Sequence, residues 1–161
     1  ALNKKMFNIF GGVMMTAGIR KERTLIIFKP DALQRKLMGE ILNRFERLGL
    51  DLLLMKTVFF TEDLCREHYK HLVDKKFFPE IVAYMTSGPT VAAILSGENA
   101  VAAVRHILGA PNPLEAAPGT IRGDYALTSG ANLVHASGSP EEANEEIVRF
   151  FKEEELRKIE G

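Results

Sequence analysis

The sequence predicts a single α+β domain, a ferredoxin-like sandwich in which helices pack on a four-stranded, mainly antiparallel sheet. Two observations lead to this prediction. The chain has 161 residues, 46% of them hydrophobic, which is enough to fill one sizeable core. From Arg23 onward, short apolar runs alternate with amphipathic stretches in the order strand, helix, strand, helices, strand, helix, strand, helix. No repeat or linker interrupts this order.

Two strands and three helices are expected in the first half of the chain. Residues 24–28 form a β-rich run that ends at Pro30, because proline cannot donate to a strand ladder. Residues 38–48 place their apolar side chains on one helical face and are followed by Gly49. The remaining elements are a strand over residues 50–60, a helix opened by Thr61 that reaches about residue 72, and a short helix over residues 77–85.

The second half continues the alternation with one long interruption. Residues 91–95 form the third expected strand, and Asn99 is expected to cap a helix that ends at Gly109. Residues 109–130 then contain three prolines and four glycines. A structureless segment of that length inside a compact domain is usually functional.

A last strand and a last helix complete the predicted fold. The strand covers residues 132–136, and Ser139 with Glu142 predicts a capping box at the start of the helix. The buried face of that helix should consist of Ala143, Ile147, Phe150 and Phe151. Residues 153–161 are expected to form a polar tail.

The composition excludes several classes of protein. Basic and acidic residues number 21 each, so no global field is available to hold DNA, RNA or an anionic membrane. An anionic ligand must therefore meet a local basic pocket. The single cysteine, Cys65, excludes an internal disulfide and a cysteine-based zinc site, and its helical setting indicates a buried or half-buried thiol. No stretch reaches the ~18 apolar residues that a membrane span requires.

Residues 1–20 differ from the rest of the chain. Residues 6–19 carry no charge, contain three glycines and show neither helical nor strand periodicity. A basic start before a short apolar run has the outline of a signal peptide, but glycines break this run and nothing downstream is typical of a secreted protein. We interpret residues 1–20 as a flexible N-terminal extension or a cloning or start-site remnant. Residues 21–161 are expected to form the single domain, in a cytoplasmic protein.

A few residues beside the predicted loops indicate phosphate chemistry, although the chain has no P-loop, no GxGxxG and no HExxH motif. Lys29 follows the first strand, Arg105 lies opposite the apolar stripe of its helix, and Arg122 lies between glycines. A nucleoside triphosphate carries roughly four negative charges, so fixed cations and a metal ion are needed to hold it. His135 lies at a strand-to-helix junction, where helix N–H groups can receive phosphate oxygens and a neutral imidazole is a competent nucleophile.

Each of these residues also has an ordinary structural explanation when taken singly. An arginine on a helix is usually a solvated surface charge, and a histidine near a strand end is more often structural or exposed than catalytic. Glu146 lies just beside an apolar stripe, where a solvated acid is the simpler interpretation, and Phe77 or Phe78 could belong to the core. A surface position on a helix suffices for the other histidines, which are His68, His71 and His106.

Taken together, these residues belong to a series of short motifs. The motifs are Lys29-Pro30-Asp31, Arg44-Phe45-Glu46, His68-Tyr69, Phe77-Phe78, Tyr84-Met85 with Ser87-Gly88-Pro89, Asn112-Pro113, Pro118-Gly119-Thr120-Ile121-Arg122-Gly123-Asp124 and Asn132-Leu133-Val134-His135-Ala136-Ser137. In this order and at this spacing they resemble the nucleoside diphosphate kinases. The likeness covers residues 23 to about 156, and the last two motifs are the most specific.

The resemblance implies a reaction and the residues that perform it. His135 would take the γ-phosphoryl group of ATP, become phosphohistidine, and pass the group to a nucleoside diphosphate in a ping-pong cycle. Ser137 and Glu146 match the residues that hold the His135 ring, and Tyr69 would lie near the transferring group. Mg²⁺ would arrive with the nucleotide, held chiefly by phosphates and water, so no residue is expected to be a direct metal ligand.

The resemblance also implies the nucleotide contacts. Lys29, Arg105 and Arg122 match phosphate-binding cations, and Lys29 and Asn132 would also reach the ribose hydroxyls. Phe77 matches the ring on which the base stacks. Stacking without hydrogen bonds to the base edges tolerates every base, which a kinase of broad specificity requires.

The chain departs from the family pattern at several positions. Pro111 stands in the nucleotide site where relatives carry a threonine that contacts a phosphate, so the pocket loses a hydroxyl donor. His71 stands where many relatives carry an acid. The other departures are Ala32, Ala131, Ala136 and Gly138.

Two other functions stay open beside the kinase. One is a nucleotide-binding scaffold of the same fold with low turnover, and the other is a protein-histidine phosphate donor that acts on a partner protein. The presence of His135 argues against a pure scaffold, which has no need of a nucleophile. The family implies a homo-oligomer, more commonly a hexamer than a tetramer, and neither nucleic acid nor a membrane is an expected partner.

Overall fold

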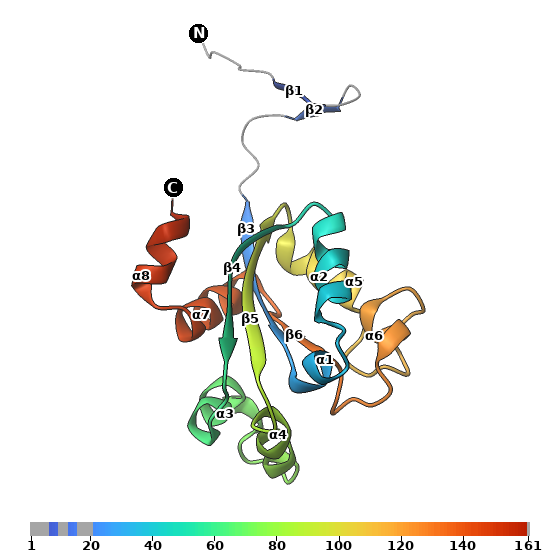
Figure 1. Cartoon of the computed structure of the whole chain (residues 1–161), viewed down its shortest axis with the longest axis vertical. Helices are drawn as coiled ribbons and strands as arrows, with labels where there is room; N and C mark the ends of the chain where they lie inside the picture. The colour runs from blue at the N-terminus through green and yellow to red at the C-terminus, as the bar shows by residue number, and fades with distance from the viewer. Residues whose placement is uncertain (1–6, 10–12, 16–20, 161) are drawn as a thin grey trace.

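The central feature of the fold is a four-stranded sheet, seen in a computed structural model that describes residues 7–9, 13–15 and 21–160 (Figure 1). Its strands are β3 (Glu22–Phe28), β4 (Asp51–Val58), β5 (Thr90–Gly97) and β6 (Val134–Ala136). They lie in the order β4-β5-β3-β6, and every neighbouring pair is antiparallel. The structure therefore confirms the predicted ferredoxin-like arrangement.

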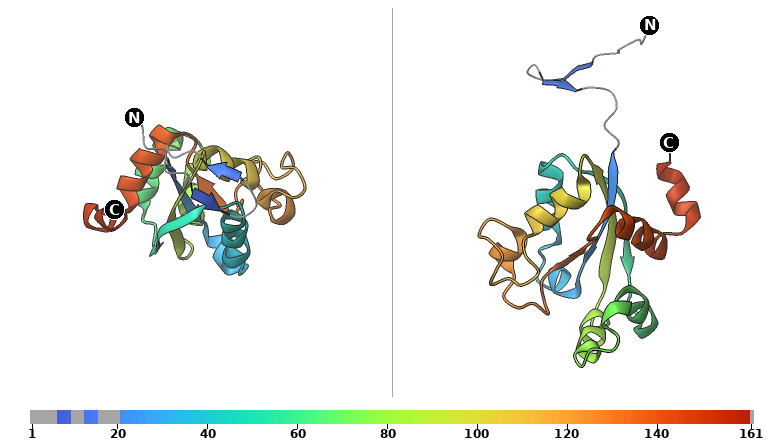
Figure 2. Two further views of the ribbon diagram at one scale, coloured as in Figure 1. Left: turned by 90° about the horizontal axis from the view of Figure 1, so that it is seen from above. Right: turned by 180° about the vertical axis from the view of Figure 1, so that it is seen from behind.

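Helices cover both faces of this sheet (Figures 1 and 2). One face carries α1 (Pro30–Gln34), α2 (Met38–Arg47), α5 (Ala100–Leu108) and α6 (Ile121–Tyr125). The other carries α3 (Glu62–His68), α4 (Phe78–Met85), α7 (Pro140–Phe150) and the short α8 (Glu153–Leu156). Two 3₁₀ turns follow α3 and α8, at Lys70–Leu72 and Arg157–Ile159.

The two-residue periodicity of the central strands divides the buried side chains between two cores. On β3, Ile26 and Phe28 face one layer of helices while Leu25 and Ile27 face the other, and all four are 0% exposed. Strand β5 is buried along its whole length in the same way. A strand covered on both faces needs apolar residues at every position, which explains its continuous hydrophobic run.

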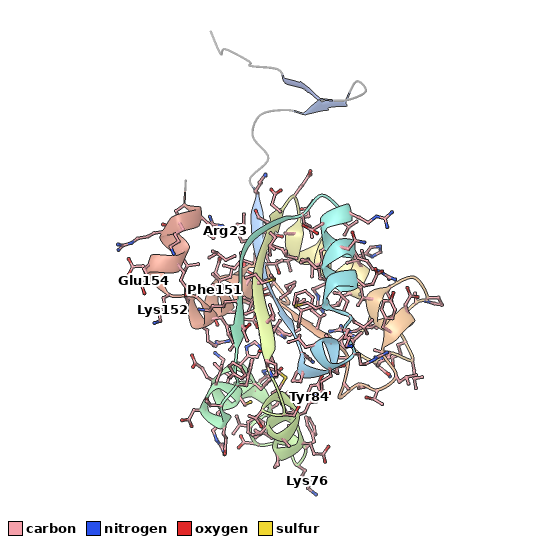
Figure 3. All side chains as sticks on the ribbon, viewed as in Figure 1. Arg23, Lys76, Tyr84, Phe151, Lys152 and Glu154 are labelled. Atoms are coloured by element: carbon pink, nitrogen blue, oxygen red, sulfur yellow. The ribbon has the colours of Figure 1, made fainter. Side chains whose placement is uncertain are left out.

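The chain after α7 is more ordered than a polar tail. Leu156 and Ile159 pack against the second core, and the guanidinium of Arg23 donates a hydrogen bond of 3.0 Å to the Ile159 carbonyl (Figure 3). The prediction for residues 153–161 was therefore wrong for most of that stretch. Two apolar residues spaced three apart are enough to dock a short helical turn onto the core, although they are too few to give a clear periodic signal.

Two other local predictions were also wrong. Asn99 has a left-handed backbone with φ of 51° and forms no side-chain cap; the carboxylate of Glu22 instead accepts a 2.8 Å hydrogen bond from the Val101 amide. A residue from a neighbouring strand thus supplies the cap of α5. Within residues 109–130, which were expected to be structureless, α6 forms a short helix whose first turn is capped by the Thr120 hydroxyl.

The N-terminal residues contain two short strands that their sequence does not indicate. β1 (Phe7–Ile9) and β2 (Val13–Met15) pair with each other in antiparallel register. The remainder of residues 1–20 lies outside the described residues, so the interpretation of this stretch as an extension stays a prediction. Across the described ranges, no helix has the length and apolar character that crossing a membrane requires.

Candidate active site

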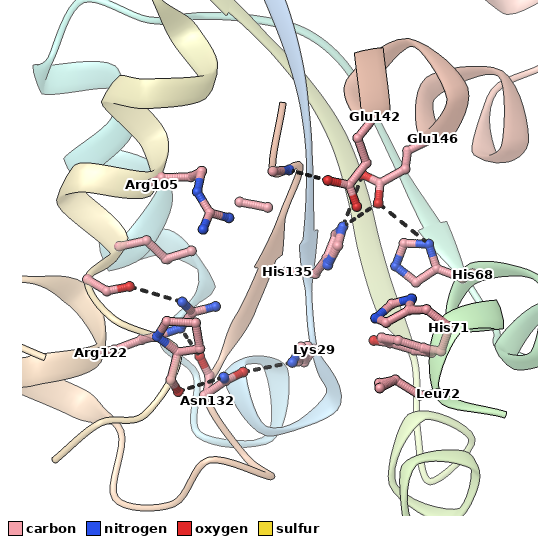
Figure 4. A pocket seen from close by; sticks show the side chains of 16 residues that line it. Lys29, His68, His71, Leu72, Arg105, Arg122, Asn132, His135, Glu142 and Glu146 are labelled. Atoms are coloured by element: carbon pink, nitrogen blue, oxygen red, sulfur yellow. Dashed lines mark hydrogen bonds and ion pairs between the residues drawn. The ribbon is translucent and has the colours of Figure 1, made fainter. Parts of the chain in front are cut away.

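A cavity of about 290 Å³ lies where β6 meets α5, α7 and the turn after α3 (Figure 4). It gathers eight of the ten residues predicted for the site, which are Lys29, Tyr69, Arg105, Pro111, Arg122, Asn132, His135 and Glu146. Of the other two, Ser137 is fully buried behind the wall and Phe77 lies outside it. The residues come from α5, α6, β6, α7 and four connecting segments, so the cavity exists only in the folded chain.

His135 is held by β6 with one ring nitrogen engaged. Its strand position pairs with Ile27 of β3, and its side chain is 18% exposed. Nε2 lies 2.9 and 3.0 Å from the two carboxylate oxygens of Glu146. Because a carboxylate can only accept, Nε2 must carry the proton, and Nδ1 of a neutral ring then carries the lone pair. In the described part of the chain no protein group bonds Nδ1, so its lone pair is left free.

Glu146 is a buried carboxylate, so its interpretation as a solvated acid was wrong. It is 3% exposed, and besides His135 it accepts a 2.7 Å hydrogen bond from the Ser137 hydroxyl. Burial by itself would raise the pKa of Glu146, but the hydrogen bonds from His135 and Ser137 outweigh it and the pKa is lowered. The Ser137 amide also donates to the Leu25 carbonyl at 3.1 Å, which ties this group to β3.

Lys29 extends from the end of β3 into a chain of polar contacts. Its ammonium donates a 2.7 Å hydrogen bond to Asn132 Oδ1, and Asn132 Nδ2 donates to the Pro111 carbonyl at 3.0 Å. Burial, with a contribution from the nearby Arg122, lowers the pKa of Lys29 to about 8. Lys29 is thus still charged at neutral pH and is fixed at the cavity wall.

Arg122 supports the strand that carries His135. Its guanidinium donates to three carbonyls, those of Asn132 at 3.2 Å, Gly109 at 3.0 Å and Val134 at 2.6 Å. Burial and then Arg105 lower the pKa of Arg122 to about 10, which leaves it charged at pH 7. Gly109 has φ of +86°, and a Cβ there would lie 2.4 Å from the Thr120 hydroxyl, so only glycine fits this approach.

Asp31 supports the site, although the sequence predicted no role for it. Its buried carboxylate accepts hydrogen bonds from the Leu133 amide, at 3.2 Å, and from the Tyr84 hydroxyl. Leu133 has a left-handed backbone with φ of 77°, an unfavourable conformation for a leucine that costs about 1–3 kcal/mol. Asp31 holds that conformation two residues before His135. Its place in the Lys29-Pro30-Asp31 motif was the available signal.

His68 was predicted to be a surface histidine, and this was wrong. Its side chain is 0% exposed, and its ring meets the His135 ring edge-on with 4.5 Å between centroids. Burial, then the charge on His135 when protonated, lowers the pKa of His68 to about 2, so it stays neutral. An isolated helical pattern did not reveal this burial, although the His68-Tyr69 motif pointed to the position.

Glu142 and His71 also line the cavity (Figure 4). The predicted capping box is half correct: the Ser139 hydroxyl accepts from the Glu142 amide at 3.1 Å, but the Glu142 carboxylate accepts from the Gly138 amide, at 2.7 Å, instead of the Ser139 amide. Glu142 thereby places a carboxylate at the cavity wall. His71 is exposed on the 3₁₀ turn, on the same side of the cavity as His68 (Figure 4).

The predicted site residues Tyr69, Arg105 and Phe77 differ in how far they are exposed to solvent. Tyr69 is half-buried, and burial raises the pKa of its phenol, so the hydroxyl remains a donor. The Arg105 guanidinium is exposed and forms no ion pair within the described residues. Phe77 is 46% exposed while Phe78 is 4% exposed, so Phe78 belongs to the core and the Phe77 ring is available.

The charges of the cavity favour an anion over a bare metal ion. The ligand atoms of His68, His135 and Glu146 lie within 4.8 Å of one another, a spacing that could hold a cation. However, Arg149 Nη1 lies 3.3 Å from His68 Nδ1, and three further cations, Lys29, Arg105 and Arg122, line the wall. A site with this many fixed positive charges and one free imidazole nitrogen is suited to bind phosphates and to attack one of them.

Comparisons with known proteins agree with this chemistry. The family model for nucleoside diphosphate kinase matches residues 22–156. The chain is similar to the nucleoside diphosphate kinases of Eremothecium gossypii, at 53% identity over 84% of this chain and 89% of the relative, and of Methanobrevibacter smithii, at 47% over 84% and 90%. It also resembles the solved structure of a halophilic nucleoside diphosphate kinase from Halobacterium salinarum in complex with CDP. That match has a TM-score of 0.81 and 42% identity, over 84% of this chain and 91% of the other.

Proposed function

The chain belongs to the nucleoside diphosphate kinase family, and from that premise we propose that it transfers the γ-phosphoryl group of ATP or another triphosphate to nucleoside diphosphates through phosphohistidine. The observation that carries this mechanism is the engagement of His135 Nε2 by Glu146, which leaves Nδ1 as the nucleophile. The family membership gives the enzyme class. The route through His135 and the roles of its neighbours are our proposal.

The first half-reaction forms the phosphohistidine. The Nδ1 lone pair of His135 attacks the γ-phosphorus, a new N–P bond forms, and the bond to the β-phosphate oxygen breaks with that oxygen keeping the electron pair. The ring becomes positively charged because Nε2 keeps its proton. The Glu146 carboxylate, 2.9 Å from Nε2, stabilises that charge. In the second half-reaction a terminal oxygen of a nucleoside diphosphate attacks the phosphorus and releases Nδ1.

Fixed cations would hold the phosphates during both steps. With a pKa of about 10, Arg122 stays charged at neutral pH, and Lys29 does so up to about pH 8. Arg105 would add its exposed guanidinium. Lys29 and Asn132, joined by their 2.7 Å hydrogen bond, would also contact the ribose hydroxyls. Tyr69 would donate its phenol to the transferring group.

Mg²⁺ would enter as part of the nucleotide substrate. The cavity has two carboxylates, and both are engaged: Glu146 by His135 and Ser137, and Glu142 by the Gly138 amide. The donor set of the protein therefore fits a metal held by phosphate oxygens and water better than one held by direct protein ligands. Such an ion would neutralise part of the phosphate charge.

The base would stack on the exposed ring of Phe77, outside the cavity that holds the phosphates. We further propose a homo-oligomer, hexameric in preference to tetrameric, and a cytoplasmic location; both rest on the family alone. Light scattering coupled to size-exclusion chromatography distinguishes a hexamer from a tetramer. A monomer in that measurement would contradict the first of these proposals.

The decisive experiment is incubation with γ-labelled ATP. We expect a protein-bound label that is labile in acid and stable in base, the behaviour of phosphohistidine, and its release when any nucleoside diphosphate is added. His135→Ala should abolish the label while leaving ADP affinity within a few-fold. Labelling of that variant at the wild-type stoichiometry would exclude the mechanism. Label that forms but is not transferred would favour the low-turnover scaffold, and transfer to a partner protein alone would favour a protein-histidine phosphate donor.

A further inference from the structure

The His68 imidazole lies against two opposite charges of α7. Its Nδ1 lies 3.3 Å from Arg149 Nη1 and 4.0 Å from Glu146 Oε1. Glu146 is 3% exposed and the Arg149 side chain 11%, so both charges lie in a poorly solvated region. Among the described residues no hydrogen bond or ion pair joins Arg149 to Glu146; Arg149 pairs with the exposed Glu67 at 3.3 Å. One nitrogen of the His68 ring thus lies within 4.0 Å of both charged groups.

The hydrogen bonding of His68 shows that packing alone does not account for it. The ring is enclosed by three aromatic side chains, Phe60, Tyr69 and Phe150, with centroid distances from 4.7 to 6.1 Å. Since Nδ1 faces an arginine, it acts as the acceptor and the proton is on Nε2. That Nε2 is buried and has no partner within the described residues, an arrangement that costs free energy. A site selected only for stability would favour an apolar side chain in such surroundings.

A direct contact between Arg149 and Glu146 would interfere with the reaction. Arginine and a carboxylate form a strong, often bidentate pair when both are shielded from water. In such a pair the guanidinium would compete for the Glu146 oxygens that now accept hydrogen bonds from His135 Nε2 and the Ser137 hydroxyl. Glu146 would then stabilise less well the positive ring that forms when Nδ1 attacks phosphorus.

We propose that His68 is a positioning residue that keeps the Arg149 guanidinium away from Glu146 and so reserves the carboxylate for His135. The ring does this as an uncharged spacer, because its burial beside several cations keeps it neutral. The inference rests on the proposed function of His135, since it concerns the rate at which that residue is phosphorylated. It does not require His68 to touch the nucleotide.

The test is a double-mutant cycle on the single-turnover rate of phosphohistidine formation from γ-labelled ATP. His68→Ala removes the spacer, and we expect the rate to fall about ten- to a hundredfold with ADP affinity unchanged. Arg149→Met alone should alter it by less than about threefold, because Arg149 does not contact Glu146 in the native protein. The double variant should recover to within about threefold of Arg149→Met, since no guanidinium remains to capture the carboxylate.

Two control variants make the result specific. Arg66→Met removes an exposed arginine of α3 that pairs with Glu62, and it should give no recovery in the His68→Ala background. His68→Phe keeps a ring in the same space without its nitrogens, so it should retain the wild-type rate within about threefold. If circular dichroism shows that the alanine variant does not fold, His68→Phe still tests the inference, because it should fold and keep the wild-type rate.

The outcomes separate this inference from the proposed function. Absence of label on the wild-type protein would refute the role of His135 itself. A labelled wild type together with an equally fast His68→Ala variant would overturn only the spacer. Failure of Arg149→Met to restore the rate, or a folded His68→Phe variant as slow as His68→Ala, would show that His68 acts through its nitrogens or through packing.

Discussion

Replacing Lys29 by Met should make the nucleotide-free protein more stable at neutral pH while weakening nucleotide binding. Burial lowers the pKa of Lys29 from 10.5 to about 8, so the folded state holds the lysine proton less tightly than the unfolded chain. Below pH 8 both states are protonated and the fold carries the full cost of the buried charge. Between pH 8 and 10.5 only the unfolded chain keeps the proton, and this cost falls toward zero.

The size of the effect follows from the pKa change. At about 1.4 kcal/mol for each pH unit, the buried charge costs roughly 3 kcal/mol at pH 7 and roughly 1 kcal/mol near pH 10. Methionine cannot form the 2.7 Å hydrogen bond to Asn132, and this loss cancels about 1–2 kcal/mol of the stability gained by removing the buried charge. The net gain for Lys29→Met should therefore be about 1–2 kcal/mol at pH 7, and it should vanish or change sign near pH 10.

Urea unfolding at fixed protein concentration, repeated from pH 7 to pH 10, measures this gain. Lys76→Met, at an exposed lysine, is the matched control and should stay within about 0.5 kcal/mol of wild type at every pH (Figure 3). Calorimetry should show ADP affinity lowered at least about tenfold in Lys29→Met. A variant that is no more stable than wild type at pH 7, with a difference independent of pH, would refute the reasoning.

Three further predictions concern other residues of the proposed site. Glu146→Gln keeps the shape but removes the charge facing His135, so rapid-quench phosphorylation should slow about ten- to a hundredfold at unchanged ADP affinity; a rate within twofold of wild type would contradict the assigned role. Pro111→Thr restores a hydroxyl donor at the cavity wall and should raise kcat/KM about two- to tenfold with slightly lower thermal stability. Unchanged or poorer kinetics with the fold intact would show that proline is the better residue there. If the base stacks on Phe77 as proposed, kcat/KM for the common diphosphates should agree within about tenfold; a thousandfold preference would reveal hydrogen-bond readout.

The sequence by itself determined the layers of the fold. The β-rich run at residues 24–28 predicted a strand, and the structure shows that its neighbours Leu25 and Ile26 lie in different cores. Local side-chain chemistry also predicted two helix starts, at Thr61 and Ser139, because a cap depends on residues three apart in the chain. The motifs predicted the family and eight of the residues that line the cavity.

Local patterns failed wherever a distant segment set the environment. Asparagine is a common N-cap residue, but Asn99 does not cap α5, because the Glu22 carboxylate of β3 accepts the hydrogen bond from the Val101 amide. Leu156 and Ile159 form too few apolar positions for a periodic signal, and only the nearby core shows why they order the tail. In each case the deciding contact joins residues that are far apart in sequence.

The site shows the same division. The sequence predicted His135 as the nucleophile from its junction and its motif, but the protonation of its ring depends on Glu146, eleven residues later. Neither the burial of Glu146 nor that of His68 follows from its own helix, since both lie beside the apolar stripe and are covered by a different element. Pairing of β6 with β3, and the packing of α7 and α3 across them, remove water from this cluster. That desolvation, which only the tertiary structure provides, makes Glu146 a buried partner of His135 and keeps the nearby His68 neutral.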